Sequence, residues 1–189
     1  MSGTPSGTLG ALFNCGCQAA AAQLVVAGTT YLADFTGNLA VLLDPAQLAQ
    51  FLAGVVTNGA TMVSLLIQEH VSNGVGAIIG PITVAMDPNR VPPASTLTAI
   101  TPSIPFPAIQ DMNVNIHVTI PNLLPGITMQ NKLSNPGPAI LRNPNVTNFP
   151  PQNDIYSLVE PIELEDVNNP GPVLATIQSF PLTVNPPTP

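Results

Sequence analysis

The stretch MNVNIHVTI, residues 112–120, alternates apolar and polar side chains at every position. Because successive side chains of a β-strand point to opposite faces, this period of two predicts a strand with one buried and one solvent-facing side. Further strands are predicted for short apolar runs separated by Pro and Asn turns, at residues 22–28, 38–43, 78–86, 155–164 and 173–184. The fold class that follows is mostly β, with a β-sandwich or jelly-roll-like body.

The first half of the chain also predicts one or two short helices. Asp44 is a suitable N-cap, and Pro45 suits the first position of a helix. The residues that follow repeat with helical spacing until Asn58-Gly59 ends the pattern, and the apolar ones are Leu48, Phe51, Leu52, Val55 and Val56. Residues 60–71 fit either a helix or a strand.

The apolar stretch 45–68 is long enough to span a membrane. Thr57-Asn58-Gly59 interrupts it, however, and no basic residue flanks either end, contrary to the usual pattern of membrane proteins. A buried helix followed by a turn fits the stretch better, so we expect no membrane span.

Proline divides the chain near residue 90. Of the 23 prolines, 4 lie in residues 1–90 and 19 in residues 91–189. Ser, Gly, Thr and Pro dominate residues 1–18, which predicts an extended N-terminal arm, and residues 19–189 are predicted to form a single β-rich domain. The start carries no base, so it does not resemble a Sec signal peptide.

Charged residues make up only 7% of the chain, against about 25% in ordinary soluble domains. The bases are Arg90, Lys132 and Arg142, and the net charge is −7. Binding to a phosphate backbone requires clustered Lys and Arg, so a nucleic-acid partner is excluded, and anionic lipid surfaces are disfavoured. A surface with so few charges is poorly protected against association, which favours burial against other copies of the chain.

The cysteines, Cys15 and Cys17, fall within the predicted arm. Two thiols and two distant histidines do not give the spacing of a zinc site, and C-x-C is one residue shorter than a redox C-x-x-C motif. In an extended segment, residues i and i+2 share a face, so both thiols can point toward a neighbouring subunit. Cys15 and Cys17 are therefore the candidates for intersubunit disulfides.

The acids concentrate in one place, at Glu160, Glu163, Glu165 and Asp166. On a regular strand Glu163 and Glu165 would share a face, and carboxylate oxygens are the ligands that Ca²⁺ prefers. The alternative is a solvated edge strand whose charges block the addition of further strands. No other cofactor is indicated.

Catalytic motifs are missing from the sequence. The histidines are His70 and His117, and His117 lies on the polar, solvent-facing side of the predicted strand 112–120. No nucleophile elbow, P-loop or dinucleotide fingerprint occurs. We therefore expect that the protein is not an enzyme.

These observations predict a structural protein that self-assembles into a fibre, sheet or coat. Uncharged β surfaces would stack on copies of the same chain, and the arm would bridge neighbouring subunits in a homopolymer. Such a disulfide-linked, proline-rich filament would lie outside the cell or form an appendage on a cell or spore surface. The alternative is a surface or secreted binding module with an acidic site for Ca²⁺ or another ligand.

Overall fold

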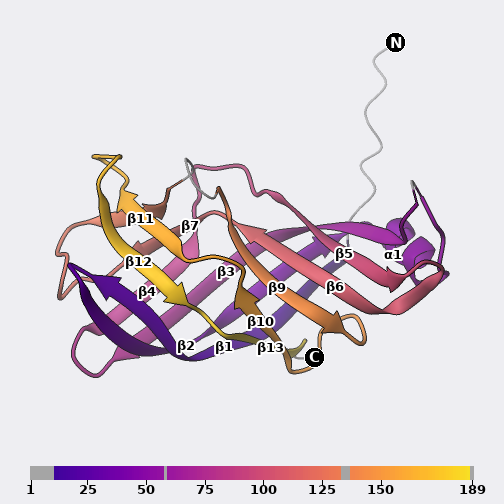
Figure 1. Ribbon diagram of the computed structural model, residues 1–189, viewed down its shortest axis with the longest axis horizontal. Helices are drawn as coiled ribbons and strands as arrows, with labels where there is room; N and C mark the ends of the chain where they lie inside the picture. The colour runs from indigo at the N-terminus through magenta and orange to yellow at the C-terminus, as the bar shows by residue number, and fades with distance from the viewer. Residues whose placement is uncertain (1–10, 58, 133–136, 188–189) are drawn as a thin grey trace, which may run out of the picture.

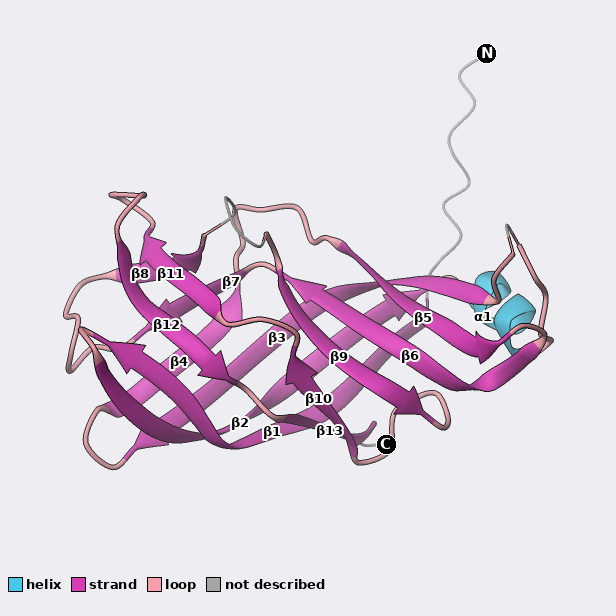
Figure 2. Cartoon of the chain, in the orientation of Figure 1, coloured by secondary structure: helices cyan, strands magenta, loops and turns pink. Residues whose placement is uncertain are grey.

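The computed structural model describes residues 11–57, 59–132 and 137–187, which form thirteen strands and one helix (Figures 1 and 2). The bounds are β1 Ala11–Val26, β2 Thr29–Leu43, α1 Pro45–Leu52, β3 Met62–Gly76, β4 Gly80–Met86, β5 Ala94–Thr101, β6 Ile104–Val114, β7 Ile116–Thr119, β8 Thr128–Asn131, β9 Ala139–Val146, β10 Asp154–Leu158, β11 Ile162–Asp166, β12 Val173–Ser179 and β13 Leu182–Pro187.

The strands form one antiparallel sheet that closes on itself. We call each passage of the chain along the closed sheet a path, formed by one long strand or by two strands end to end. The first three paths are the single strands β1, β2 and β3, and the later ones are the pairs β4/β5, β6/β7, β8/β9, β10/β11 and β12/β13. The last path pairs back onto β1. Neighbouring paths are consecutive in the chain, so the connectivity is a simple up-and-down meander. Figure 1 shows the orange and yellow strands β9, β11 and β12 crossing in front of β2, β3 and β4, which form the opposite wall.

Proline explains why the first three paths are continuous and the later ones are broken. The strands β1, β2 and β3 have 16, 15 and 15 residues, and Pro81, in β4, is the first proline within a strand. The breaks between β4 and β5, β8 and β9, β10 and β11, and β12 and β13 all contain proline, which cannot donate to the hydrogen-bond ladder. The breaks lie beside one another around the closed sheet. We call this belt the seam.

A β-bulge lets β1 cross the seam without a break. Ala21 has a positive φ of 51°, and its N–H donates to Asp34 Oδ1 at 2.7 Å, while the register with β2 shifts between Ala19 and Ala22. Such a bulge bends the strand. On one side of it β1 pairs with β13, and on the other side it pairs with β12.

The predicted fold class is confirmed, since the body is mostly β and two walls face each other as in a sandwich. The start of the predicted helix is confirmed as α1, where Asp44 Oδ1 accepts from Ala46 N at 2.7 Å and Pro45 opens the helix. The helix ends at Leu52, earlier than predicted, and Val55 and Val56 lie beyond it and are exposed. Residues 60–71 fall mainly in β3, which resolves that ambiguity as a strand.

The alternating segment 112–120 crosses the seam. Its apolar side chains all point into the core, as expected. Asn115, however, is buried and separates β6 from β7, and His117 is only partly exposed. The face predicted to be wet is therefore partly covered, because the loop after β4 packs against it.

The predicted arm, residues 1–18, is corrected where the structure describes it. Residues 11–18 belong to β1, and Cys15 and Gln18 pair with both β2 and β13. Residues 1–10 lie outside the described residues. The segment LFNCGC has the alternating pattern of a strand, but the small residues around it resemble a flexible arm.

The only helix in the described residues, α1, is far too short to cross a membrane, so no membrane-spanning helix is found there. Instead α1 packs at one end of the closed sheet, where Phe51 is buried edge-on against Phe106 with their ring centroids 5.5 Å apart. Figure 2 shows this helix in cyan at the right-hand end.

Candidate functional site

The seam divides the closed sheet into two halves. The half that contains β5, β6, β9, β10 and β13 is covered at its end by α1, and we call it the packed half. The other, with β4, β7, β8, β11 and β12, we call the chamber half, because an apolar space extends into it from the seam. The strands β1–β3 run through both halves.

Polar side chains occupy the centre of the packed half. The Tyr156 hydroxyl donates to Gln110 Oε1 at 2.6 Å, and both residues are completely buried. The Nε2 amide of Gln110 has no hydrogen-bond partner among the described residues. Burial, the charge of Asp154 and that of the Cys15 thiol raise the pKa of Tyr156 above its usual range, so this hydroxyl stays protonated.

The thiols of Cys15 and Cys17 lie in the same interior. Each residue is 2% exposed, and no disulfide joins them. Burial, followed by the charge of Cys17, raises the pKa of Cys15 to about 11, so the reactive thiolate is disfavoured at neutral pH. The sequence correctly predicts that both thiols share a face, but the face is the interior, where a neighbouring subunit cannot reach them.

The chamber lies between the two walls and is lined entirely by apolar side chains. About 280 Å³ of atom-free space, part of it open to solvent, lies among residues from the two sides of the seam, namely Val84, Val114, Ile116, Ala139, Leu141, Leu158, Ile162, Ile177 and Phe180. The space is narrow, so anything larger than a water molecule must push these side chains apart. Empty cavities with apolar linings stay dry in proteins.

Phe180 separates the chamber from a second apolar space of about 250 Å³. Val84 and Ile177 border both spaces, and Phe35 borders the second. The rings of Phe35 and Phe180 are 5.2 Å apart, and Gly74 opposite Phe35 provides the room, because a Cβ there would approach the ring to 2.5 Å.

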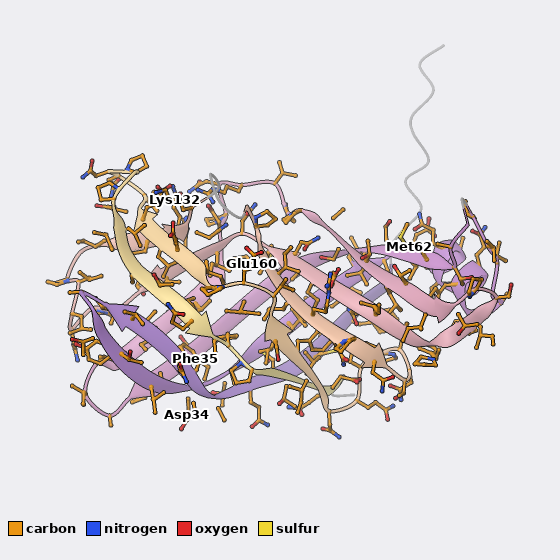
Figure 3. All side chains as sticks on the ribbon, viewed as in Figure 1. Asp34, Phe35, Met62, Lys132 and Glu160 are labelled. Atoms are coloured by element: carbon orange, nitrogen blue, oxygen red, sulfur yellow. The ribbon has the colours of Figure 1, made fainter. Side chains whose placement is uncertain are left out.

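An outer pocket of about 500 Å³, part of it open to solvent, lies in the wall beside the chamber. Its lining runs from Gly137 to Ile140 at the start of β9 and includes Val159, Glu160 and Ile162 beside the break between β10 and β11. Ala139 and Ile162 line both the outer pocket and the chamber. We call this pocket the mouth, and Figure 3 labels Glu160 on the front wall where it lies.

Charged groups gather on the seam around Asp87, whose side chain is 1% exposed. Arg90 Nε lies 3.1 Å from one carboxylate oxygen and His117 Nε2 lies 3.1 Å from the other, although His117 Nε2 has no aligned hydrogen bond. Arg90 also donates to the Asn131 carbonyl at 2.7 Å, and Asn131 Oδ1 accepts from Ile116 N at 2.8 Å. This arrangement closes the break between β4 and β5 and does not border the chamber.

The acidic residues considered for Ca²⁺ are not brought together. A register shift between Leu164 and Glu165 turns Glu165 away from the face of Glu163. Glu165 is buried, and its oxygens accept from Gln130 Nε2 at 3.2 Å and Gly171 N at 2.9 Å.

The other acids are also separated. Glu160 lies at the mouth, and Asp166 Oδ1 accepts from Asn168 N at 2.9 Å. Within the described residues, no three His, Cys, Asp or Glu side chains are close enough to hold a metal ion.

The sequence alone did not predict the chamber, the mouth or the Tyr156–Gln110 pair. One signal for the pair was present in the sequence. Gln110 lies two residues before Met112, so the alternation of the strand places the Gln110 amide on the same inward face as Met112. No local signal marks Phe180 or Ala139, since they become neighbours only when the sheet closes.

No protein-family model and no curated protein matches the sequence. Among solved structures, the chain is similar to DynF from the dynemicin biosynthesis pathway of Micromonospora chersina, with a TM-score of 0.75 and 22% sequence identity. The match covers 96% of this chain and 82% of that chain.

This likeness contradicts the predicted fibre, sheet or coat subunit, because a biosynthetic-pathway protein has the same fold. The structure gives the physical reason. Each described strand has a partner on both sides, which leaves no free edge for stacking, and the thiols expected to link subunits are buried and not bonded. The predicted filament, its disulfides, its role as a surface appendage and the homopolymer are therefore not supported.

Proposed function

We propose that the protein binds a small apolar molecule inside the closed sheet. The single observation that carries this proposal is the apolar chamber, which shares Ala139 and Ile162 with the mouth beside it. Ligand sites are typically concave, largely apolar and few per protein. Phe180 and its neighbours would move to admit the guest, which would gain the burial of its apolar surface.

The comparison with DynF supports this proposal at the level of fold. DynF comes from the biosynthesis pathway of a small molecule, dynemicin. A closed sheet of about eight strands leaves an interior that can hold one small ligand. We extend only this general role, the handling of a small molecule, to the present chain.

Binding without catalysis is part of the proposal. The chamber lining contains neither a titratable side chain nor a nucleophile. The Cys15 thiol is held in its unreactive protonated form, and Asp87 and His117 lie outside the lining. A chemical step would need one of these groups within reach of the guest.

Titration with Nile red, a neutral dye whose fluorescence rises in apolar surroundings, tests the proposal. We expect saturable binding with one site per chain. The Ala139→Leu variant should weaken binding at least tenfold, because the larger side chain fills the chamber where it meets the mouth.

Ala108→Leu is the matched control. Ala108 is equally small and fully buried, but it lies in the packed half and does not border the chamber. This variant should bind Nile red like the parent protein. Absence of saturable binding by the parent, or equal loss in both folded variants, would refute the proposed function.

A further inference from the structure

The positions of the three basic side chains restrict what the chamber can accept. Arg142 forms a fork with Asp111, at 2.6 and 2.7 Å, on the outside of the packed half. Lys132 Nζ donates to the Gly171 carbonyl at 2.9 Å, and Figure 3 shows Lys132 at the upper edge, apart from Glu160. Arg90 is engaged on the seam by Asp87 and Asn131. None of the three lines the described chamber or mouth.

The chamber also lacks neutral hydrogen-bond donors. Every residue in its described lining is apolar, the paired strand residues around it use their backbone N–H groups in the sheet ladders, and the Ile116 N–H donates to Asn131 Oδ1. A carboxylate or phosphate that entered would lose its hydration without gaining a partner. Burying an unpaired anion costs several kcal/mol, far more than one methylene of apolar burial returns.

The mouth adds a charge of the same sign as such an anion. Glu160 lines the mouth, and the remaining lining residues are apolar or glycine. The whole chain carries a net charge of −7, so the field around the opening repels anions on approach.

We propose that the chamber selects an uncharged apolar molecule and excludes carboxylates and phosphates. This inference rests on the proposed function and specifies its ligand class: a neutral alcohol, ester, ketone or hydrocarbon of small size. The selection has two causes: the described chamber lining offers an anion no positive charge or hydrogen-bond donor, and Glu160 repels anions at the mouth. It separates this protein from carriers that hold a fatty-acid carboxylate on a buried base.

Competition against Nile red with three twelve-carbon compounds tests the selection. At pH 7.5, 1-dodecanol and methyl dodecanoate should displace the dye at concentrations at least tenfold lower than dodecanoate. Equal displacement by dodecanoate would overturn the inference and leave the proposed function intact. Failure of Nile red to bind at all would overturn both.

A gain-of-function variant makes the test independent of any loss of folding. Ile140→Lys places a cation at the mouth, and it should improve displacement by dodecanoate at least fivefold with little change for dodecanol. Ile104→Lys is the matched control, because Ile104 is exposed at the far end of the packed half. If both variants improved dodecanoate binding equally, net charge rather than the mouth would be responsible, and the inference would fail.

Discussion

The two halves of the closed sheet share three continuous strands but differ in how their interiors are filled. In the packed half a helix closes the end, and a buried tyrosine, glutamine and two thiols occupy the centre. In the chamber half only apolar side chains face inward around the open space. Buried polar groups require partners at fixed distances, whereas apolar side chains can repack, so the two halves suit different tasks.

This difference suggests that the packed half stabilises the fold while the chamber half can adapt its shape. The Tyr156–Gln110 hydrogen bond orients two strand paths that are far apart in the chain. In the chamber half, Phe180 borders empty space on two sides and can change rotamer without breaking a hydrogen bond of its side chain.

Truncation of one aromatic residue from each half should give the largest contrast. Tyr156→Ala should lower the free energy of unfolding by about 3–5 kcal/mol, the usual range for removing a large buried ring. Phe180→Ala should cost clearly less, because the ring borders open space on two sides. Urea denaturation measures both losses, and an equal or larger loss for Phe180→Ala would contradict the comparison.

Enlargement of a small residue away from the chamber should cost more stability than enlargement of one that borders it. Ala108→Leu should destabilise the protein by about 1–3 kcal/mol, because the packed half has no room for the added atoms. Ala139→Leu should cost less, because Ala139 borders the open space of both the chamber and the mouth. Thermal unfolding of both variants checks this, and the contrast fails if Ala139→Leu is the more destabilising change.

Alkaline pH should act on the packed half, with the smallest effect of the three. The pKa of Cys15 is raised from 9.0 to about 11, so the unfolded chain loses this proton before the folded chain does. The stability that this thiol contributes is complete below pH 9 and falls as pH rises through about 11.

Cys15→Ala identifies the source of that pH dependence. Unfolding midpoints measured between pH 8 and pH 11 should fall less steeply in the variant than in the parent protein. Because Tyr156 also titrates above its usual range, part of the dependence should persist. Identical slopes in the two proteins would show that burial of the thiol has no energetic effect.

The sequence predicted local structure better than it predicted the closed sheet. The alternation in residues 112–120 identified the inward side chains of β6 and β7, and Asp44-Pro45 identified the start of α1. Those signals act within a few residues. The pairing of β1 with β12 and β13 joins opposite ends of the chain, and no local pattern specifies it.

The cysteines illustrate why the candidate site could not be predicted in full. Their spacing correctly placed both thiols on one face of an extended segment, but the pattern did not indicate which face would be buried. Small residues around them resembled a flexible arm. In the closed sheet those small residues, such as Ala19 and Ala22, fit where the walls approach closely.

The low charge also had a different cause from the one expected. It predicted burial between subunits, whereas the described strands bury their apolar faces within one chain, around a closed interior. The scarcity of bases still carries information, because it leaves the chamber without a partner for an anion.

The most direct test of the central claim is a titration of methyl-labelled protein with 1-dodecanol, followed by NMR. The methyl groups of Ile116, Ile162 and Ile177, which line the chamber, should shift in a saturable manner. Those of Leu97, buried in the packed half, should remain unchanged. Shifts confined to exposed methyl groups such as those of Ile78 and Val91, or no saturable shifts, would contradict binding inside the closed sheet.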